Sequence, residues 1–210
     1  MPLSGSIWEL RSGCAEESNH NDVGSVTLYR DGRPLLVDIG VETYSKKTFS
    51  AQRYEIWTMQ SSWHNLPEFD PNGKRWQQLP GSQYRAAEVQ VGSDLHTISM
   101  NIAPAYGPVP GLTYYRRTVQ LTETSLQMQD ITDYPGEIAL TLMSEEKPEI
   151  NGATVRFGTL AQMAAKGAER ITTEEIPIHD DRLHLAWQNS LYRTRIWFKT
   201  QINLCIGDGN

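Results

Sequence analysis

Two histidines and one aspartate in the first third of the chain are residue types that bind transition metals. His20 lies in a polar segment, Asp38 follows a short apolar run, and His64 lies in a polar turn. Imidazole nitrogens and carboxylate oxygens are ligands that suit zinc. Their spacing matches no compact zinc motif, so the three could equally be a surface histidine, a strand-end aspartate and a loop histidine. Asp22 is a competing ligand, although an Asn-Asp pair before Val-Gly favours a turn.

A predicted hairpin brings two of these residues towards one another. Asp31-Gly32 separates two alternating runs, 25–30 and 33–38, which is typical of a two-residue hairpin. His20 comes just before the first run, and Asp38 ends the second, so both lie at the open end of the hairpin. The pairing predicts Arg30 opposite Arg33 and Ser25 opposite Asp38, with a buried face made by Val26, Leu28, Leu35 and Val37.

Side chains that suit sugars gather near His64. Aromatic rings offer flat apolar faces, and guanidinium groups form paired hydrogen bonds with carboxylate or sulfate. The candidate substrate-binding residues are Trp63, Asn65, Arg53 and Tyr54. The alternative for the aromatic residues is the core, where rings bury a large area. Arg116 and Arg117 are adjacent in a predicted strand, so at most one of the two can face a given ligand.

Short strands separated by turn residues dominate the chain, and we predict an all-β fold: a large antiparallel β-sandwich of two stacked sheets with little helix. The one stretch of helical composition is 161–168, and 54–60 fits either a strand or a short helix. No repeat or linker divides residues 1–210, which we expect to form a single domain. From residue 84 on, strands are predicted at 87–91, 96–102, 114–121, 126–132, 138–143, 154–157, 171–176, 183–187 and 194–199.

Composition narrows the function. The 210 residues carry a net charge of -6 with a pI near 5.4, which argues against a nucleic-acid partner. No apolar run is long enough to span a bilayer, so no membrane partner is expected. Residues 1–6 show no signal peptide. Localisation is left open, with bacterial cytoplasm or periplasm expected if the chain belongs to a longer protein. Cys14 and Cys205 are expected to be free thiols.

Three segments, in order, closely resemble the heparinase II/III-like polysaccharide lyase family. They are His20-Asn21-Asp22-Val23-Gly24-Ser25, the run from Gly32 to Gly40, and the run from Gln52 to Pro67. Family members pair an N-terminal (α/α) toroid with a C-terminal antiparallel β-sandwich, and this chain resembles the sandwich alone. The resemblance implies a Zn²⁺ ion held by His20, Asp38 and His64, mainly in a structural role.

The resemblance also implies β-elimination at a uronic acid, with tyrosine and histidine as base and acid. Most of these residues come from the toroid, and the sandwich usually supplies one histidine in a Ser-His-Asn-His-Asn-Asp pattern. Here the chain reads Ser18-Asn19-His20-Asn21-Asp22, so that first histidine is missing. His20 then corresponds to the metal ligand, and the catalytic residues stay unknown.

Three hypotheses follow. The first is the sandwich part of a lyase that acts on an acidic polysaccharide, inactive without a toroid. The second is a non-catalytic saccharide-binding or scaffold module that keeps the fold and the metal. The third is a stand-alone metalloenzyme with an open coordination position, for which Glu42 or Glu55 would be the base.

Overall fold

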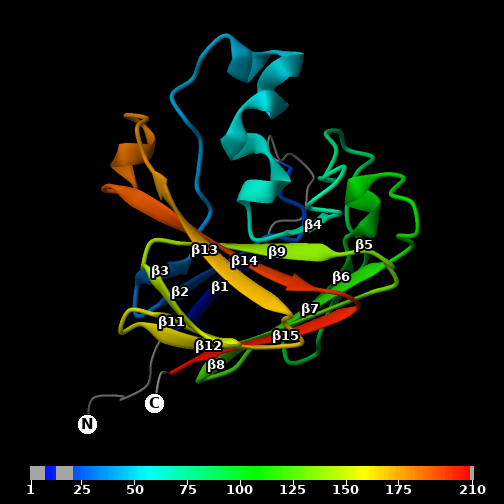
Figure 1. The fold of residues 1–210 in the computed structure, drawn as a ribbon, viewed down its shortest axis with the longest axis vertical. Helices are drawn as coiled ribbons and strands as arrows, with labels where there is room; N and C mark the ends of the chain where they lie inside the picture. The colour runs from blue at the N-terminus through cyan, green and yellow to red at the C-terminus, as the bar shows by residue number, and fades with distance from the viewer. Residues whose placement is uncertain (1–7, 13–20, 209–210) are drawn as a thin grey trace.

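The computed structural model describes residues 8–12 and 21–208, which form three antiparallel sheets (Figure 1). The first sheet has the order β1-β2-β3, with β1 (Trp8–Ser12), β2 (Val26–Arg30) and β3 (Arg33–Leu36). The second has the order β13-β14-β9-β4, with β13 (Arg170–Pro177), β14 (Ser190–Phe198), β9 (Ile138–Ser144) and β4 (Pro67–Phe69). The all-β sandwich expected from the sequence is confirmed.

The largest sheet has eight strands and the order β10-β11-β12-β15-β8-β7-β6-β5. Its strands are β10 (Pro148–Asn151), β11 (Thr154–Phe157), β12 (Ala161–Lys166), β15 (Gln201–Gly207), β8 (Ser125–Thr132), β7 (Tyr115–Leu121), β6 (Thr97–Asn101) and β5 (Ala87–Val91). None of the helices in the described ranges is long and apolar enough to cross a bilayer.

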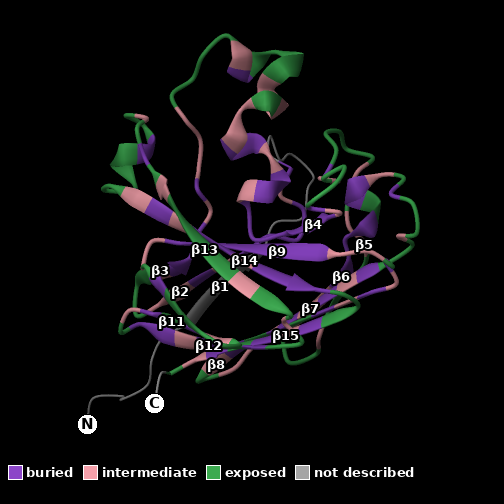
Figure 2. Cartoon of the chain, viewed as in Figure 1, coloured by how far each residue is buried: buried purple, intermediate pink, exposed green. Residues whose placement is uncertain are grey.

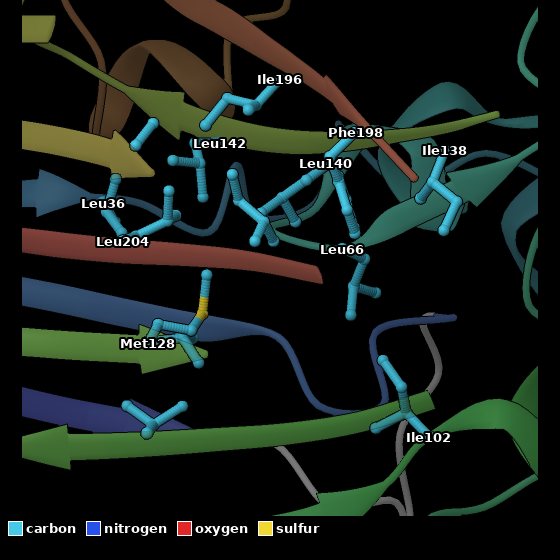
Figure 3. Close-up of a cluster of buried hydrophobic side chains, with 14 of the residues drawn as sticks. Leu36, Leu66, Ile102, Met128, Ile138, Leu140, Leu142, Ile196, Phe198 and Leu204 are labelled. Carbon is cyan, nitrogen blue, oxygen red and sulfur yellow. The ribbon is translucent and has the colours of Figure 1, made fainter. Parts of the chain in front are cut away.

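One apolar core fills the space between the eight-stranded and four-stranded sheets. Figure 3 shows Leu140 and Ile196 of the smaller sheet above Met128 and Leu204 of the larger one, and all four are at most 2% exposed. β9 is buried at all seven residues and is purple along its length in Figure 2. Leu36 of the hairpin belongs to the same cluster, so the small sheet closes this core as well.

The predicted hairpin is present, with one change of register. Arg30 pairs with Arg33 across Asp31 and Gly32, which have φ of 51° and 74°, as a two-residue turn requires. A bulge then pairs Leu28 with Leu36, so Ser25 does not lie opposite Asp38 as predicted. The four residues of the predicted face are all buried, and so is Leu36.

Two other local predictions are wrong. Residues 161–166 form strand β12, because Ala161, Met163 and Ala165 alternate into the core between β11 and β15, and pairing overrides helix propensity. Residues 183–187 contain the 3-10 helix η6 (Leu183–Leu185) in place of a strand. From β4 on, four strands lie outside the predicted ranges: β4, β10, β12 and β15.

Between β3 and β4 the chain makes an excursion that stands above the four-stranded sheet in Figure 1. It carries four 3-10 helices: η1 (Lys47–Phe49), η2 (Ala51–Glu55), η3 (Trp57–Met59) and η4 (Ser61–Trp63). A second apolar cluster anchors it, made of Val37, Ile39, Met143, Ile178, Leu183, Trp187 and Leu191, with Trp57 and Trp63 packed against them. The excursion thus covers part of the sheet face that points away from the core.

Candidate functional site

Two of the three predicted metal ligands meet where the excursion begins and ends. Asp38 lies two residues after the end of β3, between Val37 and Ile39 of the second apolar cluster, and its Oδ1 accepts a hydrogen bond from the Gly40 amide at 2.8 Å. His64 caps the end of η4 and has 0% exposure. The start and the end of a 27-residue segment are therefore joined at this pair.

The geometry of the pair fixes the roles of the imidazole nitrogens. His64 Nε2 lies 3.1 Å from the Thr58 carbonyl oxygen, which can only accept, so Nε2 carries a hydrogen. His64 Nδ1 lies 3.2 Å from Asp38 Oδ2. The Asp38 carboxylate thus faces Nδ1, the imidazole nitrogen that the Thr58 contact leaves available.

The third predicted ligand, His20, lies outside the described residues. Within residues 8–12 and 21–208, no three His, Cys, Asp or Glu side chains are grouped so that they could hold a metal ion. The zinc site therefore stays a prediction, of which the structure describes two ligands. The Asp22 carbonyl accepts a hydrogen bond from the Ser25 amide at 2.9 Å, the turn that the sequence favours there.

Asn65, a predicted substrate-binding residue, is 0% exposed and holds three segments together. Its Nδ2 donates to the carbonyls of Val26 and Val37, at 2.7 and 3.1 Å. Its Oδ1 accepts from the Met143 amide at 2.6 Å. All the polar atoms of this side chain thus bind the backbone of the hairpin and of β9, and they set the position of the neighbouring His64.

A buried ion pair that the sequence did not predict supports the same segment from inside the sandwich, and it takes Arg117 away from any ligand. Arg117 on β7 and Asp130 on β8 are directly paired across the strands, and both are 0% exposed. Arg117 donates to Asp130 through Nε and Nη2, at 2.9 and 2.7 Å. Its Nη1 donates to the carbonyls of Gly24 and Asn65, at 2.8 and 2.7 Å. The guanidinium therefore fastens both the hairpin entry and the residue after His64.

Burial alone would lower the pKa of Arg117, but the charge and hydrogen bonds of Asp130 raise it above its ordinary value. Burial, together with Asp130, raises the pKa of Tyr115, whose hydroxyl donates to Asp130 at 2.6 Å. These groups keep their charge states at neutral pH: the arginine charged and the tyrosine neutral. The network is thus a fixed support, not a proton-transfer system.

The other predicted site residues lie in the excursion. Trp63 is half-buried, meets Trp57 edge-on with ring centroids 5.0 Å apart, and lies under the Arg193 guanidinium at 3.9 Å. Arg53 and Tyr54 lie on η2 and are half-buried. The excursion thus brings them onto the same segment as His64.

The two candidate bases of the metalloenzyme hypothesis also lie in the excursion, and each already contacts a neighbour. Glu42 accepts a hydrogen bond from Trp57 Nε1 at 2.6 Å. Glu55 pairs with Lys47 at 2.8 Å. Both carboxylates therefore have contacts that tie the excursion together.

Next to Trp63, the outward face of the four-stranded sheet carries a cluster of basic and aromatic side chains, of which the sequence indicated only Arg75 as a possible contact for acidic sugars. We call it the arginine face: Arg75, Arg170, Arg193, Arg195, Trp197, Glu68 and Glu174. Alternation along β14 was the available signal, because residues 193, 195 and 197 must share one side of a strand. Their partners opposite on β13 are Glu174, Thr172 and Arg170.

The arginine face is crowded with positive charge. Glu68 is 1% exposed and accepts from Arg75 Nε at 3.2 Å and from Arg195 Nη2 at 3.0 Å. Burial, and then the nearby Arg193 and Arg75 charges, lower the pKa of Arg195 against the opposing effect of Glu68. Arg170 and Arg195 lie 3.8 and 4.9 Å from the ring centroid of Trp197. Four arginines and two glutamates leave an excess of positive charge here.

Comparison with known proteins identifies the fold. No family model matches the sequence, and no curated protein matches it. Among solved structures, the heparan sulfate lyase HepC from Pedobacter heparinus matches with a TM-score of 0.65 and 15% identity, over 97% of this chain and 33% of that one. A heparinase III structure matches with a TM-score of 0.62 and 15% identity, over 97% and 32%.

The chain spans about a third of the length of these two proteins. At this level of identity the likeness concerns the fold. The chain therefore has a heparinase-like β-sandwich fold.

Proposed function

We propose that this chain is the β-sandwich part of a heparinase-like polysaccharide lyase that acts by β-elimination on uronic-acid polysaccharides and carries a structural zinc ion. The observation that carries the proposal is the meeting of His64 and Asp38, 26 residues apart, at 3.2 Å within a heparinase-like fold. These are two of the three residues that the sequence resemblance assigns to the metal. The fold and the site thus support the same reading from separate observations.

The described ligands fit zinc by their chemistry. Two atoms bound to a tetrahedral zinc at about 2.0–2.1 Å lie about 3.3 Å apart, close to the distance between His64 Nδ1 and Asp38 Oδ2 of 3.2 Å. The bond from Nε2 to the Thr58 carbonyl is the type of second contact that orients a metal-binding imidazole. In the proposal, His20 completes the set, and the ion holds the hairpin and both ends of the excursion together.

The role proposed for the residues of this chain in the reaction is to bind and orient the polysaccharide. The arginine face offers guanidinium groups to the carboxylates or sulfates of an acidic polysaccharide. Trp63 offers a ring to the apolar face of a sugar. Arg53 and Tyr54, on the same excursion, remain proposed contacts. The base and the acid would come from an (α/α) toroid domain in the longer protein.

Metal analysis tests the zinc site. We expect one zinc ion per chain in the purified protein and its loss in His64→Gln. His96→Gln is the control, because His96 lies in an exposed turn on the other sheet. An unmutated protein without bound zinc would overturn the metal assignment.

Ultraviolet absorbance of unsaturated uronate products tests the lyase assignment on glycosaminoglycans and alginate, with the chain alone and with any helical region that its gene encodes upstream. Product formed only with that region is the expected result. Saccharide binding without product in both cases would favour the non-catalytic module. The non-catalytic module is retained as a second candidate because Ser18-Asn19 stand where the sandwich domain of the family usually has a histidine.

A further inference from the structure

The face of the eight-stranded sheet that points away from the core carries a hollow outside the site described above. Its volume is about 470 Å³, and it lies over the four central strands β7, β8, β15 and β12. Neighbouring strands lie about 4.8 Å apart, so four strands span roughly 14 Å. The hollow is therefore wide enough for several linked sugar rings and stands apart from the His64–Asp38 pair.

The strand register arranges the lining in two rows across the strands. The first row is Thr118, Gln129, Asn203 and Lys166, and the second is Gln120, Gln127, Cys205 and Ala164. Cys205 and Ala164 of the second row have small side chains, so the surface is hollowed there between the longer side chains around them. We call this feature the amide groove.

The lining of the amide groove offers neutral hydrogen-bonding groups in quantity. Each amide side chain has two donors and an acceptor with two lone pairs. Gln129 Nε2 donates to Asn203 Oδ1 at 2.7 Å, which orders these two amides. Within the described residues, the amides of Gln120 and Gln127 bind no other side chain. No acidic residue lines the groove, although the chain carries 25 Asp and Glu.

We infer that the amide groove is a second saccharide-binding site, which takes an oligosaccharide through its hydroxyl groups. Hydroxyls both donate and accept, as amides do, and so match this lining. A protein partner would need large apolar or aromatic anchors, and a nucleic acid would need several basic side chains. The lining has no aromatic residue and a single lysine, Lys166. Such a site would keep the protein on its polysaccharide without taking part in the reaction.

Cys205 provides the test, because it is an exposed free thiol in the groove. In a Cys14→Ser background, the reaction rate of Cys205 with a chromogenic disulfide reagent is measured with and without cellohexaose and an unsulfated heparosan hexasaccharide. With ligand at ten times Kd, about a tenth of the grooves stay free, so the rate should fall about tenfold. Absence of protection by both oligosaccharides would overturn the proposal.

Two groove variants and a control make the test specific. The double variant Gln129→Ala/Asn203→Ala removes the ordered amides, and we expect it to weaken binding about tenfold, as measured by calorimetry. Gln127→Leu keeps the size of the side chain but removes its amide, and should weaken binding less. Gln90→Ala, an exposed residue on the edge strand β5 and outside the groove, should bind like the unmutated chain. Equal binding by all four proteins would overturn the assignment to the groove. Zinc content and lyase activity do not enter these measurements.

Discussion

At the scale of single residues, the site depends on groups that a ligand does not touch. Asn65 and Arg117 are both fully buried, and their hydrogen bonds end on backbone carbonyls and amides beside His64 and the hairpin. A buried charge is tolerated only with a partner and satisfied hydrogen bonds, which Asp130 and the two carbonyls provide here. Arg117 is therefore a structural residue, whereas the adjacent Arg116 forms an ion pair with Glu88 at the surface.

Arg117→Met should lower the free energy of unfolding by about 3–5 kcal/mol, because it leaves the Asp130 carboxylate buried without its counter-charge. Arg116→Met is the matched control. Arg116 pairs with Glu88 on the surface, so its loss should cost less than about 1 kcal/mol. Urea denaturation of both variants measures the difference. Equal costs would show that the buried pair contributes no more than a surface pair.

A second prediction at this scale compares two glycines that share a positive φ, Gly24 at 81° and Gly32 at 74°. Both alanine variants bear the backbone cost of a left-handed residue, about 1–2 kcal/mol. A Cβ at Gly24 would also lie 2.6 Å from Ile102 Cγ2, whereas nothing lies within 4 Å of one at Gly32. Gly24→Ala should therefore be the more destabilising by a further 1–3 kcal/mol or so, as measured by urea denaturation.

At the scale of elements, the excursion is held in two places. The His64–Asp38 pair closes its base, and Asp180, just before η6, holds it further out. Both carboxylate oxygens of Asp180 accept from the Thr43 amide at 3.0 Å, and its Oδ1 accepts from the Leu183 amide at 3.1 Å. One carboxylate thus joins the excursion to the β13–β14 connection.

The Asp180 contact should depend on pH. Slight burial opposes the effect, but hydrogen bonds from Thr43, Leu183 and Arg182 lower the pKa of Asp180 below its ordinary 3.8. Its stabilising contribution is therefore complete above that value and is lost as pH falls through the lower, folded-state pKa. The NMR amide signal of Thr43 should shift with a midpoint below 3.8. Asp180→Asn should abolish this titration, whereas the neighbouring Asp181→Asn should leave it intact.

At the scale of the whole molecule, charge is unevenly distributed. The chain has a net charge of -6, yet the arginine face combines four arginines with two glutamates. An acidic polysaccharide would be repelled by the molecule as a whole and attracted by this face. Salt screens both effects, and the Debye length falls from about 10 Å at 0.1 M to about 3 Å at 1 M.

Binding of a heparan sulfate oligosaccharide should therefore weaken as salt is added, despite the negative net charge. Arg170→Gln, which removes an exposed charge from the face while leaving Glu68 its partners, should weaken binding about threefold at low salt. Arg156→Gln, an exposed arginine on β11 paired with Glu149, is the control and should bind as before. Calorimetry measures each affinity, and an equal loss in both variants would remove the arginine face from the proposed binding surface.

The sequence by itself determined the features that depend on neighbours along the chain. Alternating runs and an Asp-Gly turn were enough for the hairpin and for the β-sandwich class, because both follow from the period of a strand and the backbone of a turn. Residue types and the family resemblance, and not spacing, marked His64 and Asp38 as metal-ligand candidates. Local composition was misleading at 161–168, where alanines that favour a helix in isolation form a paired strand.

Only the tertiary structure decided how distant residues are used. It brought His64 to within 3.2 Å of Asp38, buried Asn65 and Arg117 as supports, and gathered the arginine face from three strands and a turn. The physical reason is that burial and charge pairing are set by strand register and sheet packing across long gaps in the sequence, such as the 127 residues between Arg195 and Glu68. Alternation with Tyr115 and Val119 places Arg117 on the inner face of β7. Only the tertiary structure supplies Asp130 and the two backbone carbonyls that make its burial possible.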